Sequence, residues 1–550
     1  MHQYGAYGTV PMHLFNYHNP YPYDEEAEMS IGDYFLNKKY ARLIAIIGSC
    51  SVALAMLSVS TNANAAVQQL VIADSEPPQT FDPVRANNST VDLVNVPLYD
   101  VLVDFDSNNK LGGRLATSWK VSSDGLEVAV SLRGGVEFHD GAPLTSADVK
   151  YTLDRIKKLN VGVASSLAVY SSTTIVDSKN LTINLSKRSA TFVSALSRAY
   201  ILNSKLVEKN AGTDSGQSWL GTRGAGSGPY SLVSYTANQE AVFTKNPNYW
   251  RAFTKQADKI IIRYTPQSAT QRDLLKSGEI DVAMKIATAD LNGFKADSKF
   301  VVQDASTIVQ LYIHMNTMKG PLKDVKVRQA ISLAYDYESH VRNIMGGNGA
   351  IAQGPLPKSI ACHAYIADGK QNLARAKELL RQAKVKNLKL TMIYLSVIEE
   401  HARGGLMLQS ALKSIGVDLQ LVTVTYPEYV SQISKPSTTP DMGMISAFPA
   451  YPDADAVLRI VYDSANLSGG NNFAYSNPAV DTLVREAASI SDSSKRCVLY
   501  REAQRLISKD YPSLYISNPK FVTVRNTNVT GNYYRAAHHN TVDFFAMMLK

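Results

Sequence analysis

"LATSWKVSSDGLEVAVSLRGGVEFHDGAPLTSADVKYTLDRI" (residues 115–156) changes its hydrophobic period partway along its length. Residues 126–133, LEVAVSLR, alternate apolar and polar side chains, which predicts a β-strand with one solvent-exposed face. The later segment TSADVKYTLDRIKKL places Val149, Leu153 and Ile156 on one helical face. Strands that alternate with helices in this way along the chain predict α/β lobes.

The polar residues between this strand and helix resemble an acid–base cluster. His139 and Asp140 are adjacent, and Thr145 and Asp148 follow shortly after them. Thr145 precedes Asp148 by three residues, however, which is the spacing of a capping box that satisfies free amides in the first helical turn. The letters HDGAP before it are typical of a turn. We therefore expect this stretch to be structural and not catalytic.

The N-terminal region has the pattern of a secretory signal peptide. Basic residues, including Lys38 and Lys39, precede the apolar run 43–59, and small residues spaced A-x-A end at Ala65. A short apolar core with an immediate small-residue exit predicts cleavage after Ala65 and not a membrane span. We therefore treat residues 1–65 as a leader and expect an exported, soluble, periplasmic protein.

Two alternatives remain open in the leader. Residues 1–28 do not resemble a basic n-region, so Met29 is a plausible true start. The letters IGSC, which end at Cys50, can also be read as a lipoprotein cleavage site.

Composition narrows the functional class. A chain of 550 residues is too long for a single core, so two or three domains are expected. The formal net charge is +8, but the Lys and Arg residues are dispersed and form no recognition motif, which argues against nucleic-acid binding. Cys362 and Cys497 remain after leader removal, and whether they form a disulfide stays open at this point.

Further segments extend the α/β pattern. Further ranges share a helical period and are predicted to form amphipathic helices: 324–336, 372–383, 405–417, 481–490 and 495–510. The glycine-rich segment 221–235 lacks the Gly-Lys-Ser/Thr of a phosphate loop and runs into YSLVSY, which predicts a tight entry to a strand.

Catalytic and metal-binding motifs do not appear in the sequence. It contains no G-x-S-x-G, H-E-x-x-H, paired C-x-x-C or Walker motif. Cys362 and His363 are adjacent and so are poorly placed to act as nucleophile and base. His538 and His539 lack a third ligand and are interpreted as a surface pair. We expect a protein that is not an enzyme and has no cofactor and no metal.

The segment at 115–156 resembles the signature of family 5 of the solute-binding proteins of bacterial ABC importers, the peptide/nickel/opine type. Further segments match this family in order, at 227–250, 274–283, 321–336, 354–357 and 471–487. The resemblance covers nearly all of residues 66–550.

The resemblance implies a type II periplasmic-binding fold, with two lobes joined by a hinge. Motif order assigns 66–98, 227–322 and 520–550 to lobe I, 99–226 to its inserted subdomain and 323–519 to lobe II. The implied function is to capture peptides or peptide-like solutes by hinge closure and to deliver them to an inner-membrane ABC permease, acting as a monomer.

The resemblance also locates candidate ligand anchors. Dipeptide binders of the family hold the ligand ammonium with an aspartate, and the comparable position here is Ala450. They hold the carboxylate with an arginine, where this chain has Leu395 and Ser396, with Arg403 further on. Because a buried ligand charge without a partner costs several kcal/mol, both changes argue against a free dipeptide. A longer or blocked peptide, a sugar or an opine-like solute fits better.

Nearby carboxylates leave one alternative open. Asp453 or Asp455 can hold an ammonium, although we favour a structural role at the start of the next helix. The resemblance marks six candidate substrate-binding residues: Asn88, Ser89, Tyr426, Phe448, Ala450 and Tyr451. The last three are expected on a strand beside the ligand backbone, and a core position for Tyr426 remains open.

Two further alternatives remain open for the function. The ligand can be a non-peptide solute, such as an opine, a glycoside or a metal chelate. The protein can also be a sensor partner that presents its ligand to a membrane receptor.

Overall fold

The computed structural model describes residues 67–550 except 87, 367–368, 468–471, 532 and 539–540. Val67–Lys550 form one compact unit, to which residues 1–66 do not belong. The predicted signal peptide therefore lies outside the described residues. Within the part of the chain that is described, no helix combines the length and the apolar character needed to cross a membrane.

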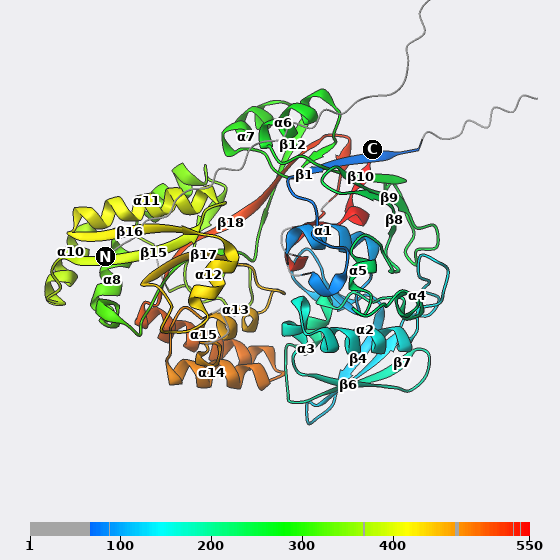
Figure 1. Ribbon diagram of the computed structural model, residues 1–550, viewed down its shortest axis with the longest axis horizontal. Helices are drawn as coiled ribbons and strands as arrows, with labels where there is room; N and C mark the ends of the chain where they lie inside the picture. The colour runs from blue at the N-terminus through cyan, green and yellow to red at the C-terminus, as the bar shows by residue number, and fades with distance from the viewer. Residues whose placement is uncertain (1–66, 87, 367–368, 468–471, 532, 539–540) are drawn as a thin grey trace, which may run out of the picture. The chain divides into compact units, whose positions relative to one another are not determined.

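A twelve-stranded mixed sheet runs through this unit (Figure 1). Its first section contains β1 (Gln69–Asp74), β8 (Tyr230–Thr236), β9 (Glu240–Lys245), β10 (Lys259–Tyr264), β11 (Val282–Ala283) and β12 (Phe300–Ser306). Its second section contains β13 (Gln310–Met315), β14 (Gly349–Ile351), β15 (Leu388–Leu395), β16 (Val417–Val424) and β17 (Met442–Ala447). The long strand β18 (Ser513–Asn526) belongs to both sections. The order is β16-β15-β17-β13-β18-β11-β1-β10-β9-β8, and β12 and β14 also pair with β18.

Two stretches of chain, which lie side by side, connect the two sections of the sheet. The N-terminal part of β18 pairs with β13 and its C-terminal part pairs with β12. The segment 307–309 joins β12 to β13, and Thr307 Oγ1 donates a hydrogen bond of 2.6 Å to Pro519 O. This pair of adjacent crossings is the geometry of a hinge. The lobe boundaries at 322/323 and 519/520 stay a prediction, and the strand pairing groups β13 with the second section.

Alternate residues of β15 face two different layers of helices. Leu388, Leu390 and Met392 share a core with α8 (Val325–Ala334), α10 (Leu373–Gln382) and α11 (Glu399–Ser414). Ile393 and Leu395 instead pack with α12 (Tyr426–Ile433) on the other face. The strand order β16-β15-β17 is parallel, with α11 as the crossover from β15 to β16.

A third group of helices forms its own core. It contains α13 (Asp455–Tyr462), α14 (Pro478–Ser489) and α15 (Ser493–Asp510). Cys362 and Cys497 form a disulfide that attaches the segment before α10 to α15, which answers the question left open by the sequence. Gln504 Nε2 supports the same attachment by donating to Cys362 O at 2.8 Å.

The predicted helices are present, with ends within three residues of the prediction except at the start of one helix. Helix α11 begins at Glu399, six residues before the expected start at 405. Gly404 and Gly405 lie inside it, where a Cβ would come within 3.0 Å of Tyr335 Oη and 3.3 Å of the Met392 methyl group. These glycines therefore permit close packing on the sheet and do not begin the helix.

The segment after α1 (Ser89–Leu98) forms a separate antiparallel sheet in the order β4-β5-β7-β6. Its elements are β4 (Ala116–Val121), β5 (Glu127–Leu132), β6 (Tyr170–Ile175), β7 (Asn180–Leu185) and α2 (Ser146–Leu159). The predicted capping box is confirmed, because Thr145 N donates to Asp148 Oδ2 at 2.9 Å. Asp148 Oδ1 also accepts a hydrogen bond from Ser204 N at 3.0 Å. The cluster is structural, as expected.

The glycine-rich segment enters β8 directly, as predicted. A Cβ at Gly226 would lie 1.9 Å from Leu98 O, so only glycine fits against the end of α1. His139 is partly buried beside this crossing, with Nε2 3.1 Å from Gly228 O.

The interpretation of His538 as a surface residue is wrong. His538 is buried, with Nε2 3.0 Å from Asp104 Oδ1 and Nδ1 3.0 Å from Tyr200 Oη. It packs there because α1 and the C-terminal segment share one core. His539 lies outside the described residues.

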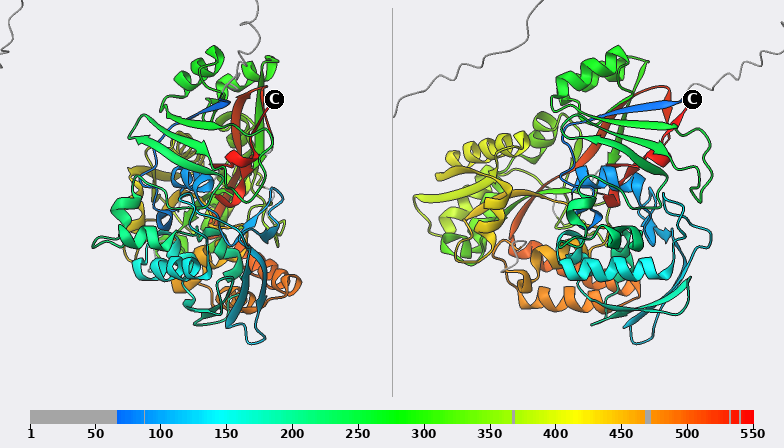
Figure 2. Two further views of the ribbon diagram at one scale, coloured as in Figure 1. Left: turned by 90° about the vertical axis from the view of Figure 1, so that its right-hand side faces the viewer. Right: turned by 45° about the vertical axis from the view of Figure 1, so that its right-hand side comes forward.

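The remaining elements are short or peripheral: α3 (Phe192–Ala195), α4 (Ser204–Lys209), α5 (Gln217–Leu220), α6 (Ser268–Ser277), α7 (Leu291–Ala296), α9 (Tyr337–Ser339), β2 (Val103–Phe105), β3 (Leu111–Gly113), β19 (Val529–Thr530), β20 (Tyr534–Arg535), β21 (Thr541–Val542) and β22 (Met548–Leu549). Both views in Figure 2 place α14 and the β4–β7 sheet at the same end of the unit. A backbone hydrogen bond of 2.9 Å from Ala190 N to Ala488 O joins the segment after β7 to α14.

Candidate functional site

A cavity of about 590 Å³ is lined by residues from both sides of the hinge. Gln79, Asn88 and Ser89 contribute from the segment between β1 and α1. The opposite wall is built by α12, α13 and the ends of β15 and β17. We call the parts of the unit that carry the first and the second section of the sheet its first and second halves. A ligand in this cavity would therefore contact both halves.

Four of the six predicted site residues line this cavity. Asn88 and Ser89 lie on one side, and Tyr426 and Phe448 lie on the other. Asn88 has a structural role as well, because its Oδ1 accepts from Val91 N at 3.0 Å and so caps α1. Tyr426 is 61% exposed and Phe448 is 51% exposed, so neither is a core residue. Their role in binding a ligand stays a prediction.

Ala450 and Tyr451 are placed differently from expectation. Strand β17 ends at Ala447, so Phe448, Ala450 and Tyr451 all lie after it and not on the strand predicted for them. Ala450 and Tyr451 also do not line the cavity. Pro449 and Pro452 explain the early end of the strand, because proline has no amide hydrogen to donate. The side chain of Tyr451 is 4% exposed and packs into the core that contains α1.

An aromatic group at the base of the cavity was not found from the sequence. The His314 ring stacks on Tyr312 with centroids 5.0 Å apart, and on Phe473 at 5.9 Å. Its Nδ1 lies 2.7 Å from Ser513 Oγ. Burial lowers the pKa of His314 to about 3, so the ring is neutral at physiological pH. All six residues of β13 are buried, so no alternation marked one of them as facing a cavity.

Asp453 and Asp455 have internal partners. Arg496 Nη2 donates to Asp453 Oδ1 at 2.8 Å, and Arg459 Nε donates to Asp455 Oδ2 at 2.9 Å. Asp453 Oδ1 also accepts from Asp455 N at 2.9 Å, in agreement with the favoured structural role. Arg403, on α11, does not line the cavity. Its Nη2 donates a hydrogen bond of 2.9 Å to the backbone oxygen of Asn343.

Leu395 and Ser396 differ in their position relative to the cavity. Leu395 is buried and lines its wall. Ser396 is exposed, and its backbone N bonds to Val424 O at 3.3 Å. The position that was compared with an arginine anchor therefore presents an aliphatic side chain to the cavity.

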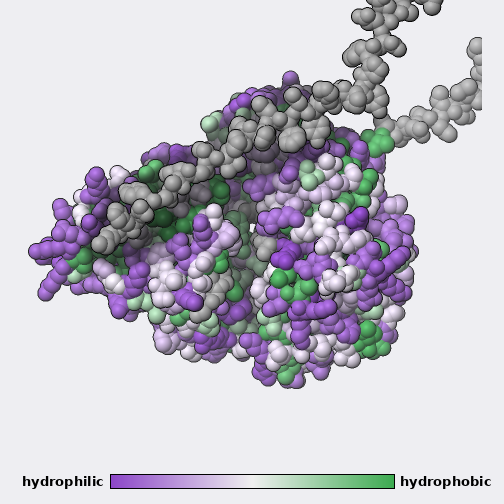
Figure 3. All heavy atoms as spheres, in the orientation of Figure 1, coloured by the Kyte–Doolittle hydropathy of each residue, from purple (hydrophilic) through white to green (hydrophobic). Residues whose placement is uncertain are grey.

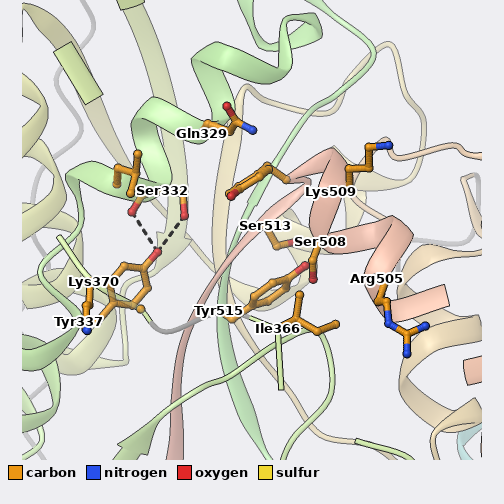
Figure 4. Close-up of a pocket in the computed structure, with 13 residues that line it drawn as sticks. Gln329, Ser332, Tyr337, Ile366, Lys370, Arg505, Ser508, Lys509, Ser513 and Tyr515 are labelled. Carbon is orange, nitrogen blue, oxygen red and sulfur yellow. Dashed lines mark hydrogen bonds between the residues drawn. The ribbon is translucent and has the colours of Figure 1, made fainter. Parts of the chain in front are cut away.

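A second cavity, of about 460 Å³, lies entirely in the second half of the unit (Figure 4). Tyr337 Oη is shared there between Ser332 Oγ and Ser332 O, both at 3.1 Å. Because only one half lines this cavity, a ligand in it would not favour closure. The cavity shared by both halves is thus the better candidate.

The two halves also contact each other outside the shared cavity. Asn109 Nδ2 donates to Ser359 O at 3.3 Å, in addition to the contact between Ala190 and Ala488. The face seen in Figure 3 mixes hydrophilic and hydrophobic residues, with hydrophilic ones predominating along the outer edges. Within the described residues, no group of three or more His, Cys, Asp or Glu side chains is placed to hold a metal ion.

Known proteins resemble the whole described unit. The family model for bacterial extracellular solute-binding proteins, family 5, matches residues 110–469. The chain is 28% identical to the probable D,D-dipeptide-binding periplasmic protein DdpA of Escherichia coli (strain K12), covering 86% of this chain and 94% of that protein. It is 28% identical to the glutathione-binding protein GsiB of Pectobacterium atrosepticum, with 85% and 92% covered.

A solved structure supports the fold. The periplasmic binding protein DppA of Helicobacter pylori, in complex with peptide STSA, superimposes with a TM-score of 0.74 at 23% identity, covering 88% of this chain and 98% of that one. The predicted α/β class and type II periplasmic-binding fold are confirmed.

Proposed function

The chain belongs to family 5 of the bacterial extracellular solute-binding proteins, the binding components of ABC importers, and from this premise we propose that it captures a peptide or peptide-like solute in the cavity shared by its two halves. The observation that carries the proposal is that Asn88 and Ser89 face Tyr426 and Phe448 across this cavity. A ligand that contacts both walls stabilises the closed form selectively, because it loses half its contacts when the hinge opens.

The proposal includes export and delivery. The mature protein acts as a monomer in the periplasm, after removal of the predicted signal peptide, and presents its solute to an inner-membrane permease. Binding involves no covalent step, so the protein is not an enzyme, and nucleic acid is not a partner. The names of DdpA and GsiB, which refer to peptide and peptide-like ligands, support this assignment.

Native mass spectrometry of protein purified from its own periplasm, without refolding, tests the proposal. We expect a bound species whose mass matches a short peptide or a peptide derivative. Thermal unfolding provides the second readout, since a ligand at a hundredfold excess over its dissociation constant adds about 2.7 kcal/mol of stability. A Tyr426→Ala variant should lose most of this gain, whereas Leu406→Ala, exposed on α11 outside the cavity, should keep it.

The proposal fails if the purified protein carries no ligand and no peptide or peptide derivative raises its unfolding temperature. It also fails if the protein turns its ligand into a product during incubation.

A further inference from the structure

We propose that this cavity selects a neutral, largely apolar solute and rejects one whose ammonium or carboxylate group would lie inside it. The inference rests on the proposed function and specifies its substrate class. Its first support is that, among the described residues that line the cavity, none carries a charged side chain.

The wall on the side of the second sheet section is aliphatic. Leu395, Ile398 and Ile445 line it from β15, the start of α11 and β17, and Val430 and Ile433 line it from α12. Transfer of an apolar group onto such a wall is favourable by about 25 cal/mol per Å² of buried area. An ionised group placed there would give up its hydration without gaining a partner.

The base of the cavity offers hydrogen bonds but no charge. Tyr429 lines it with a side chain that is 0% exposed, and its hydroxyl has no hydrogen-bond partner within the described part of the chain. His314 also lines the base, with a neutral ring that is 6% exposed and an Nδ1 that lies 2.7 Å from Ser513 Oγ. This ring suits one neutral polar atom on an otherwise apolar ligand, whereas the Tyr429 hydroxyl is enclosed by protein.

Two carboxylates next to the lining residues of α13 are already neutralised. Asp453 and Asp455 form ion pairs with Arg496 and Arg459, and neither carboxylate lines the cavity. Recruiting one of them to an ammonium group would break a partly buried ion pair, which costs more than a new exposed pair returns. The ligand therefore finds no ready counter-ion in either of these aspartates.

A smaller recess beside the cavity shares Gln79 and Asn88 with it and adds Asp82 and Arg85. Asp82 is bonded by Arg155 through both carboxylate oxygens, at 2.9 and 2.6 Å, and so is not available. Arg85 is exposed at the rim. We therefore expect a free carboxylate to be tolerated only if it extends out of the cavity towards this recess. The experiment below distinguishes this position from a carboxylate held inside the cavity.

The test compares versions of one Leu-Phe-Leu tripeptide by isothermal titration calorimetry. We expect the N-acetyl, C-amide form to bind at least about tenfold more tightly than the forms with a free ammonium or with a lysine at the central position. The N-acetyl form with a free carboxylate should lie between them if the rim accepts it. Lower ionic strength should not improve binding of the blocked form.

A neutral fluorescent probe, N-phenyl-1-naphthylamine, separates this inference from the peptide assignment. The probe should bind to the unmodified protein and be displaced by the blocked peptide. Phe448→Lys places a charge at the cavity without disturbing a core residue and should weaken probe binding at least about tenfold. Val233→Lys, exposed on β8 outside the cavity, is the matched control and should bind the probe normally.

The outcomes are distinguishable. Tighter binding of the free, charged tripeptide than of the blocked one overturns the inference and leaves the peptide function standing. Probe binding that is lost in Phe448→Lys, together with no binding of any tripeptide, supports the inference and refutes the peptide assignment. Equal probe binding by Phe448→Lys and Val233→Lys overturns the inference.

Discussion

Replacement of Arg155 by methionine tests how the first wall of the cavity is held. Arg155 lies on α2 and bonds Asp82 through two hydrogen bonds of 2.9 and 2.6 Å, and the two side chains are 3% and 1% exposed. Asp82 Oδ1 also accepts from Val84 N at 3.1 Å in the turn that leads to Asn88. The ion pair therefore attaches the segment that leads to Asn88 to α2.

The expected cost follows from this geometry. Arg155→Met keeps a side chain of similar length but leaves the Asp82 carboxylate buried with only a backbone donor. Removing one partner of a buried pair typically costs about 3–5 kcal/mol. The control on the same helix is Lys150→Met, which removes an i,i+4 pair with Asp154 whose side chains are 41% and 42% exposed. That pair is worth about 0.5 kcal/mol or less.

Urea unfolding, monitored by tryptophan fluorescence and circular dichroism, measures both variants. A further variant, Arg155→Met combined with Asp82→Asn, removes the uncompensated charge and should recover part of the loss, giving a coupling free energy above about 1 kcal/mol. Affinity for the blocked tripeptide should fall in Arg155→Met and not in Lys150→Met. If the two single variants unfold at the same urea concentration, the ion pair does not hold this wall and the reasoning is wrong.

Three further predictions concern the second half of the unit. Reduction of the Cys362–Cys497 disulfide, or Cys497→Ser, should lower the free energy of unfolding by about 2–5 kcal/mol, because the bond closes a long loop; an unchanged urea midpoint with and without reductant would contradict this. Gly443→Ala should weaken ligand binding, because its Cβ would lie 2.4 Å from a ring carbon at the cavity base, whereas Gly293→Ala meets no atom within 4 Å and should bind normally in the same titration. Burial lowers the pKa of His401 to about 4, so the folded state resists a proton that the unfolded state takes up below about pH 6.5. The contribution of His401 to the free energy of unfolding is thus fully present above pH 6.5 and is lost as the pH falls towards 4. This contribution makes the free energy of unfolding fall by about 1.4 kcal/mol per pH unit, and His401→Leu should remove that slope in urea titrations between pH 6 and 4.5.

The helices could be predicted from the sequence because their signals are local. Asp324, Asn372, Asn477 and Asp492 each accept a hydrogen bond from the first turn of the helix that follows. An apolar stripe at helical spacing follows each of these caps. The sheet could not be derived in the same way. Strand β18 pairs with β12, β13 and β14, which precede it by well over a hundred residues, and no local pattern specifies such partners.

The candidate site was predicted in part. Resemblance to the family placed Asn88, Ser89, Tyr426 and Phe448, whose side chains line the shared cavity. It predicted Phe448, Ala450 and Tyr451 on one strand, but β17 ends at Ala447, just before Pro449, and Ala450 and Tyr451 do not line the cavity.

The aromatic base of the cavity was missed for a different reason. It joins His314 from β13 to Phe473 from the segment before α14, which are far apart in the sequence. Gly443 of β17 pairs with His314, and the absence of a Cβ there leaves room for the Phe473 ring. Residues that form a site only through contacts with residues distant in the sequence carry no local pattern that can be recognised in one sequence.

The arrangement of charges explains how closure can be selective without being costly. Asp82 is paired with Arg155, and Asp453 with Arg496, each within one side of the hinge. Ion pairs formed within a wall stay intact when the hinge moves, so closing the cavity breaks neither of them. What closure brings together is aliphatic and aromatic surface. A neutral apolar ligand completes that surface, whereas a charged one would have to give up its own hydration with no change in the protein to compensate it.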